Sequence, residues 1–113
     1  MRICRERRAL DMLGMARGAG ALLVGQDKVL PALKGGETFA VFVTDDCSAN
    51  VMRHIDAAAR RGGAEIFLLE GTGRGELGAS LGVTAAQVAA LPAKSGFVKK
   101  IYTLTCDRSD ANE

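Results

Sequence analysis

The residues best placed to bind a ligand form a glycine-led turn at the start of a predicted helix. Gly25 follows the apolar run 21–24 and precedes a segment, 26–34, whose apolar residues have helical spacing. The first turn of a helix has backbone N–H groups without partners and carries a partial positive charge. A glycine just before it also lets another backbone approach closely. The pattern predicts a site for phosphate or for the edge of a nucleotide, made of Gly25, Gln26, Asp27 and Lys28.

Other residue groups could do chemistry, but none forms a recognised catalytic arrangement. Asp45 and Asp46 follow an apolar run and could hold a metal ion or act as acid and base. Such a pair more often leads into a helix and complements its dipole, and we favour that interpretation. His54 cannot form a zinc site with the three cysteines at any recognised spacing. We therefore expect no catalytic residues, no metal ion and no cofactor.

Residues 73–78 match the literal pattern Gly-x-Gly-x-x-Gly after a predicted strand. In a dinucleotide-binding domain this pattern opens the first βα unit, and an acidic residue that binds ribose follows about 20 residues later. Here the next predicted strand is short, and residues 97–100 are Phe, Val, Lys and Lys. The glycines are therefore predicted to shape a tight loop and a helix.

The remaining pattern alternates between helical and strand-like segments, which is typical of a layered α/β domain. Strands are expected over 22–24, 39–43, 66–69 and 87–91, and helices over about 5–17, 26–34, 48–61, 74–81 and from Ser95 onward. This order predicts a three-layer α-β-α sandwich with a four-stranded mixed sheet. We expect a single domain over 1–113, with a core from about 5 to 106 and a frayed polar tail over 107–113.

The charge distribution allows a nucleic-acid partner. The net charge is only +2, but basic residues gather in groups: Arg2, Arg5, Arg7, Arg8 and Arg17 near the N-terminus, then Arg60 with Arg61, and Lys94 with Lys99 and Lys100. Uneven basic charge is typical of nucleic-acid binders. Solvated helix faces explain the same distribution equally well.

The chain has no feature that would direct it to or across a membrane. No run approaches the roughly 20 apolar residues that span a bilayer. The basic segment 1–8 has no uncharged apolar segment behind it, so it does not form a signal peptide. Three widely spaced cysteines fit reduced thiols. We expect a cytoplasmic protein with no membrane partner and no small-molecule substrate.

Four segments in order resemble the ribosomal L-seven-Ae and L-thirty-e superfamily, which binds kink-turn RNA and includes short bacterial YlxQ-type proteins. The resemblance runs from about Ala9 to Ile101. Its carriers are the helix and glycine turn at 10–20, the turn at 24–29, the strand, acidic turn and helix cap at 40–48, and the Leu-Gly-x-x-x-Gly segment within 76–82.

The resemblance implies an RNA contact at the glycine-led turn, where the family has Gly-x-Asn-Glu-x-x-Lys. Counted from Gly25, Asp27 stands in place of the Asn, Lys28 of the Glu and Pro31 of the Lys. An ionised Asp only accepts hydrogen bonds, whereas an Asn also donates. A second contact region in the family is a small apolar loop that can cover an unstacked base, here Val83, Thr84 and Ala85 with Ala86.

The function expected from the sequence is non-catalytic binding of structured RNA, either kink-turn-like or ribosomal, with a ribosome-associated role. Two alternatives remain open. The chain could be a protein-interaction module on the same scaffold that has lost RNA binding. It could also be the substrate-recognition domain of a larger RNA-modifying protein.

Overall fold

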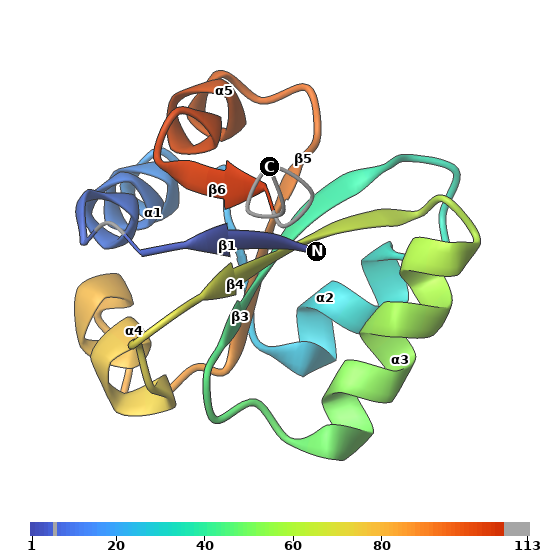
Figure 1. Cartoon of the computed structure of the whole chain (residues 1–113), viewed down its shortest axis with the longest axis horizontal. Coiled ribbons are helices and arrows are strands. Elements are labelled where there is room, and N and C mark those ends of the chain that lie inside the picture. The colour runs from blue at the N-terminus through green and yellow to red at the C-terminus, as the bar shows by residue number, and fades with distance from the viewer. Residues whose placement is uncertain (6, 108–113) are drawn as a thin grey trace.

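The computed structural model describes residues 1–5 and 7–107 (Figure 1). Helices and strands alternate along this part of the chain. They are β1 (Arg2–Cys4), α1 (Arg8–Gly18), β2 (Leu23–Val24), α2 (Gln26–Ala32), β3 (Phe39–Thr44), α3 (Ala49–Arg60), β4 (Ala64–Leu69), α4 (Arg74–Leu81), β5 (Val88–Pro92), α5 (Gly96–Tyr102) and β6 (Thr105–Asp107).

The strands form one mixed sheet in the order β2-β5-β3-β4-β1-β6. Strand β3 runs parallel to β4, and β4 runs parallel to β1. The pairs β3 with β5, β5 with β2, and β1 with β6 are antiparallel. The sheet is therefore mixed, as predicted, and the carboxyl ends of β2, β3, β4 and β1 meet at one edge together with the starts of β5 and β6.

The prediction of four strands is wrong, because the sheet has six within the part of the chain that the structure describes. The two additional strands, β1 and β6, extend it beyond β4. Each has three residues, and they pair with each other from opposite ends of the chain. Such short segments have no clear alternation of their own, and only long-range pairing stabilises them. Their formation also moves the start of the first helix from about residue 5 to Arg8 and leaves Leu104 beyond the end of α5.

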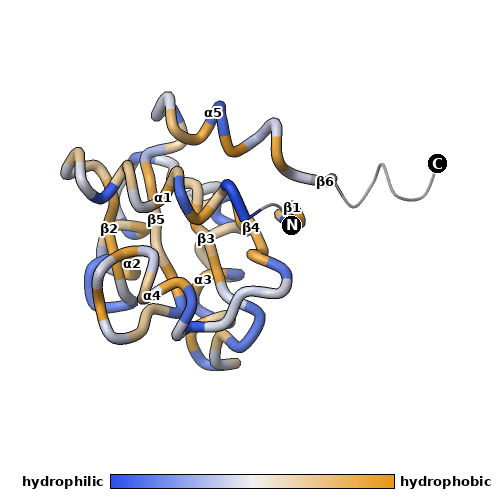
Figure 2. Tube along the Cα trace, turned by 90° about the vertical axis from the view of Figure 1, so that its left-hand side faces the viewer, coloured by the Kyte–Doolittle hydropathy of each residue, from blue (hydrophilic) through white to orange (hydrophobic). Residues whose placement is uncertain are grey.

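The helices form two layers, one on each face of the sheet (Figure 1). Helices α1, α4 and α5 cover one face, and α2 and α3 cover the other. Strand β3 is buried along its whole length and divides its side chains between two cores, with Phe42 toward α1, α4 and α5 and Val41 toward α2 and α3. Figure 2 shows the corresponding hydrophobic colour along β3 and β5 in the middle of the molecule. The predicted three-layer architecture is correct.

Two helices begin at a serine whose side chain caps the first turn, as expected from the sequence. The Ser48 hydroxyl accepts a hydrogen bond from Val51 N at 3.3 Å, and the Ser95 hydroxyl accepts one from Phe97 N at 3.2 Å. These caps replace backbone partners that a first helical turn lacks. Of the expected polar tail, Asp107 ends β6 and 108–113 lie outside the described residues. No helix within 1–5 and 7–107 is long and apolar enough to cross a bilayer.

Candidate nucleic-acid interface

The glycine-led turn connects β2 to α2 and is open to solvent. Gly25 has φ +88°, which residues with a side chain rarely adopt, and no atom lies within 4 Å of where a Cβ would be. Its carbonyl accepts hydrogen bonds from Lys28 N at 3.2 Å and Val29 N at 3.0 Å. No side chain caps this helix. Within the described chain, the N–H groups of Gln26 and Asp27 therefore have no hydrogen-bond partner and face solvent.

The second predicted contact region, Val83 to Ala85, lies in the loop between α4 and β5. Thr84 and Ala85 are exposed, whereas Val83 is half-buried against the core under α1 and α4. Gly82 ends α4 in the left-handed conformation, with φ +76°. Val83 N then donates to Gly78 O at 2.9 Å, which turns the loop back along α4.

Sheet pairing brings this loop and the glycine-led turn to the same edge of the molecule. Strand β2 pairs with β5, with Val24 opposite Ala89. One residue further, Gly25 N donates to Val88 O at 2.9 Å. The turn therefore leaves the sheet where the 83–85 loop enters it. Two predicted contact regions about 60 residues apart in the sequence therefore lie next to each other in the structure; that they bind RNA stays a prediction.

Gly78 fixes the conformation of the 83–85 loop because it has no side chain. A Cβ on Gly78 would lie 2.6 Å from Ala85 Cα and 2.9 Å from Thr84 C, both backbone atoms. The loop is also held at Ala86, whose N–H donates to Arg74 O at 3.0 Å. Gly78 is the last glycine of the Gly-x-Gly-x-x-Gly run, which therefore packs a loop against a helix, as the sequence interpretation proposed.

The acidic pair Asp45 and Asp46 joins the turn that follows β3 to the start of α4. Asp46 Oδ1 accepts hydrogen bonds from the Thr44 hydroxyl at 2.8 Å and from Arg74 N at 3.0 Å. These two bonds lower the pKa of Asp46, with the Thr44 bond contributing most. Asp45 accepts a hydrogen bond from Gly71 N. Asp46 therefore complements the N-terminus of α4 and not that of α3, the following helix to which the prediction referred, whereas Asp45 bonds to the loop before α4. Within the described ranges, no group of three His, Cys, Asp or Glu residues could hold a metal ion.

Gln87 connects the end of the 83–85 loop to the start of α3. Its side-chain oxygen accepts a hydrogen bond from Ser48 N at 2.9 Å. Its backbone oxygen accepts one from Thr44 N at 3.1 Å. Three loops at this edge are therefore held by side-chain and backbone bonds before any partner binds, and such preorganisation reduces the entropy lost on binding.

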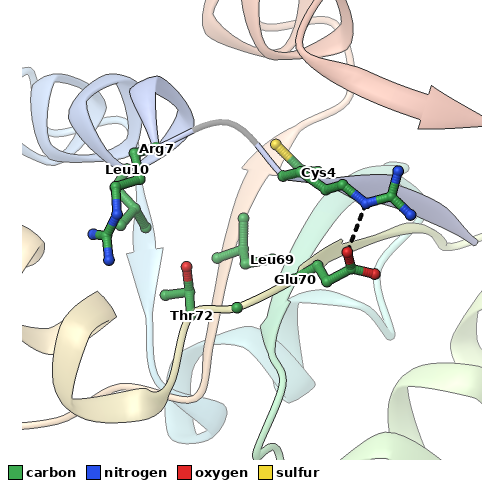
Figure 3. Close-up of a pocket in the computed structure, with 8 residues that line it drawn as sticks. Cys4, Arg7, Leu10, Leu69, Glu70 and Thr72 are labelled. Atoms are coloured by element: carbon green, nitrogen blue, oxygen red, sulfur yellow. Dashed lines mark hydrogen bonds and ion pairs between the residues drawn. The ribbon is translucent and has the colours of Figure 1, made fainter.

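Three of the arginines near the N-terminus, Arg2, Arg5 and Arg7, form ion pairs with carboxylates. Arg5 Nε lies 2.6 Å from Glu70 Oε1, and Arg7 Nη2 lies 2.8 Å from Glu76 Oε2. The pair at Glu70 is drawn as a dashed line in Figure 3, beside a cavity of about 210 Å³ between the start of α1 and the end of β4. Arg2 Nε lies 3.3 Å from Glu65 Oε2. These arginines are thus partly neutralised, which weakens the inference from charge clustering alone that they bind phosphate.

Sequence reasoning missed one basic residue at the interface. Arg17 was grouped with the N-terminal arginines, but its Nη1 donates to Leu81 O at 2.6 Å. It also lies 3.4 Å from the position of a Cβ on Gly82. Arg17 therefore stands beside the 83–85 loop. No local sequence signal could have placed it there, because the contact depends on how α1 packs against α4.

This arrangement and the sequence together define the class of protein. The chain belongs to the ribosomal protein L7Ae/L30e/S12e/Gadd45 family, whose model matches residues 7–102. Among curated relatives, the large ribosomal subunit protein eL8 of Halobacterium salinarum is 29% identical over 92 residues, which cover 80% of this chain and 75% of that protein. The resemblance seen in the sequence is therefore confirmed.

Solved structures have the same fold. A protein of unknown function from Bacillus halodurans superposes with a TM-score of 0.76 at 23% identity, covering 88% of this chain and 97% of that chain. The Giardia lamblia 15.5kD RNA binding protein superposes with a TM-score of 0.67 at 15% identity, covering 89% of this chain and 88% of the other. At these identities the comparisons establish the architecture alone.

Proposed function

We propose that this chain is a non-catalytic, cytoplasmic protein that binds structured RNA, of kink-turn or ribosomal type. The RNA would bind at the edge formed by Gly25, Gln26, Asp27 and Lys28 together with Val83, Thr84 and Ala85. The observation that carries this proposal is the Gly25 N–Val88 O hydrogen bond of 2.9 Å, because it joins both regions in one exposed surface. Membership of a family that includes ribosomal proteins supports RNA as the partner.

The geometry of the turn suits the sugar-phosphate backbone. Uncapped N–H groups at the start of a helix bind phosphate oxygens. Gly25, which has no side chain, leaves room for the RNA strand to approach them. Lys28 is exposed and forms no ion pair within the described chain. It would add a positive charge beside these N–H groups.

The side chains of the turn depart from the family pattern, and this affects specificity more than the fold. Asp27 accepts hydrogen bonds and would therefore recognise a base edge that donates, such as an amino group. Pro31 lies inside α2 and supplies no charge. We infer that Lys28 takes over the phosphate contact that a lysine at position 31 would make, so that base preference differs from that of the family.

A titration with three RNAs tests the proposal. A kink-turn RNA, a folded ribosomal RNA fragment and a regular duplex of equal length would be compared at about 50 and about 200 mM salt. We expect tighter binding of one folded RNA than of the duplex at both salt concentrations. Equal affinity for all three, lost together at the higher salt, would show only non-specific attraction and contradict the proposal.

A further inference from the structure

A second surface is a groove between α2 and α3, the two helices that lie side by side on one face of the sheet (Figure 1). Its volume is about 230 Å³, and it is lined by Leu30, Leu33, Lys34, His54, Ala57, Ala58 and Arg61. Leu33 and Ala58 are 3% and 1% exposed and form the floor, while Leu30 is half-buried. The groove therefore offers apolar contact along two neighbouring helices.

The rim of this groove carries positive charge that the protein itself does not neutralise. The charged residues are Lys34 and Arg61; both are exposed, as is the neighbouring His54, and none of the three forms an ion pair within the described residues. This contrasts with Arg2, Arg5 and Arg7, which are paired with glutamates. Asp56 lies two positions from His54, about 200° around the helix axis, so its carboxylate faces away from the groove. Asp27 lies near the start of α2, one turn before Leu30, whereas Lys34 lies just beyond the end of this helix.

We propose that the α2–α3 groove binds an acidic amphipathic helix of a partner protein. Such a helix would place apolar side chains on Leu30 and Ala57, the accessible apolar residues of the groove, and its carboxylates beside Lys34 and Arg61, which is the helix-in-groove mode of recognition. These apolar side chains favour a protein over RNA, because phosphates would gain nothing from them. The unpaired rim favours an acidic helix over a basic one, because like charges at a rim reject a partner.

The proposal is tested with designed peptides and isotope-labelled protein. The probe is a fluorescent, alanine-based helical peptide of about 16 residues with leucines at positions i, i+3, i+4 and i+7 and glutamates at a few positions beside this apolar stripe, spaced so that no two are four residues apart. One control peptide replaces the glutamates with lysines, and another replaces the leucines with serines. Anisotropy gives the affinity, and amide chemical shifts map the bound surface.

We expect the Glu/Leu peptide alone to bind and to shift the amides of Leu30, Lys34, Ala57 and Arg61. The double variant Lys34→Glu/Arg61→Glu should weaken this binding roughly tenfold or more. Lys99→Glu, which changes an exposed lysine outside the groove, should leave it unchanged. The double variant should also keep its affinity for the RNAs above, which separates this inference from the proposed function.

Three outcomes would overturn the inference. The first is amide chemical shifts confined to another surface. The second is equal binding of the control peptide in which lysines replace the glutamates. The third is loss of RNA binding in the Lys34→Glu/Arg61→Glu variant when the parent protein binds no peptide. The last result would assign the rim to phosphate contact instead.

Discussion

Replacing Gly78 with alanine tests how tightly the 83–85 loop packs on α4. The new Cβ would lie 2.6 Å from Ala85 Cα, 2.8 Å from Ala85 N and 2.9 Å from Thr84 C. Carbon atoms in good contact are about 3.5–4.0 Å apart, so the loop must move by about 1 Å. The obstructing atoms belong to the backbone and cannot rotate away. Insertion of a methyl group into such a site costs about 1–3 kcal/mol.

Gly75→Ala is the matched control, because this glycine lies in the same helix and has no atom within 4 Å of its Cβ position. Alanine there should stabilise the protein by up to about 1 kcal/mol through helix propensity alone. Gly78→Ala gains the same helix propensity, but it also disturbs the packing of the 83–85 loop on α4. The difference between the two variants therefore isolates the packing cost, which we expect to be about 1–3 kcal/mol.

Urea denaturation measures both variants, and thermal unfolding should show a difference of about 4 °C for each kcal/mol in a chain of this size. RNA affinity measured on the same samples reports separately whether the displaced loop contributes to binding. If Gly78→Ala proves as stable as Gly75→Ala, the close contact between α4 and the loop does not exist as described.

Three further predictions follow from the site. Lys28→Glu should reduce RNA affinity and lower the slope of log affinity against log salt concentration by about one to two charges. Lys99→Glu is the control. An unchanged slope would mean that Lys28 does not contact the RNA. Gly25→Ala should destabilise the protein by about 1–3 kcal/mol in urea denaturation, because φ is +88° there; full stability would mean that the turn has another conformation. Asp46 has a lowered pKa in the folded state, so its stabilisation is present above pH 4 or so and is lost as the pH falls through the folded-state pKa. Wild type should therefore exceed Asp46→Asn in stability near pH 7 and converge with it near pH 2, and a constant difference across this range would argue against the Thr44 and Arg74 hydrogen bonds.

Much of the fold could be predicted because its central elements have strong local patterns. The fully apolar segment of β3 and the apolar run of β4 are typical of strands covered on both faces. Ser48 marks the start of α3 by a capping interaction that depends on neighbouring residues only. In contrast, β1 and β6 depend on pairing between residues such as Ile3 and Cys106. No window of sequence contains both partners, so local patterns cannot reveal this pairing.

The candidate site was predictable in its parts, but not in the contacts that hold them. The glycine before a helical segment identified the turn at Gly25, whereas the resemblance to the family identified the 83–85 loop. The bonds from Gln87 to Ser48 and from Asp46 to Arg74 join segments far apart in sequence, and they follow only from the order of the strands. Charge counting was the least informative signal, because it could not show which arginines already have a glutamate partner.

The length of β2 has a consequence for how the interface behaves in solution. This strand has two residues and, among the described residues, pairs with β5 alone, so few hydrogen bonds resist its separation from the rest of the sheet. Brief separation of β2 from β5 costs less free energy than unfolding of the whole domain. A ligand that clamps the segment against β5 would suppress such openings, and the amide proton of Gly25, which is bonded to Val88 O, would then exchange with solvent more slowly. Affinity for such a ligand would thereby depend on the rigidity of the shortest strand.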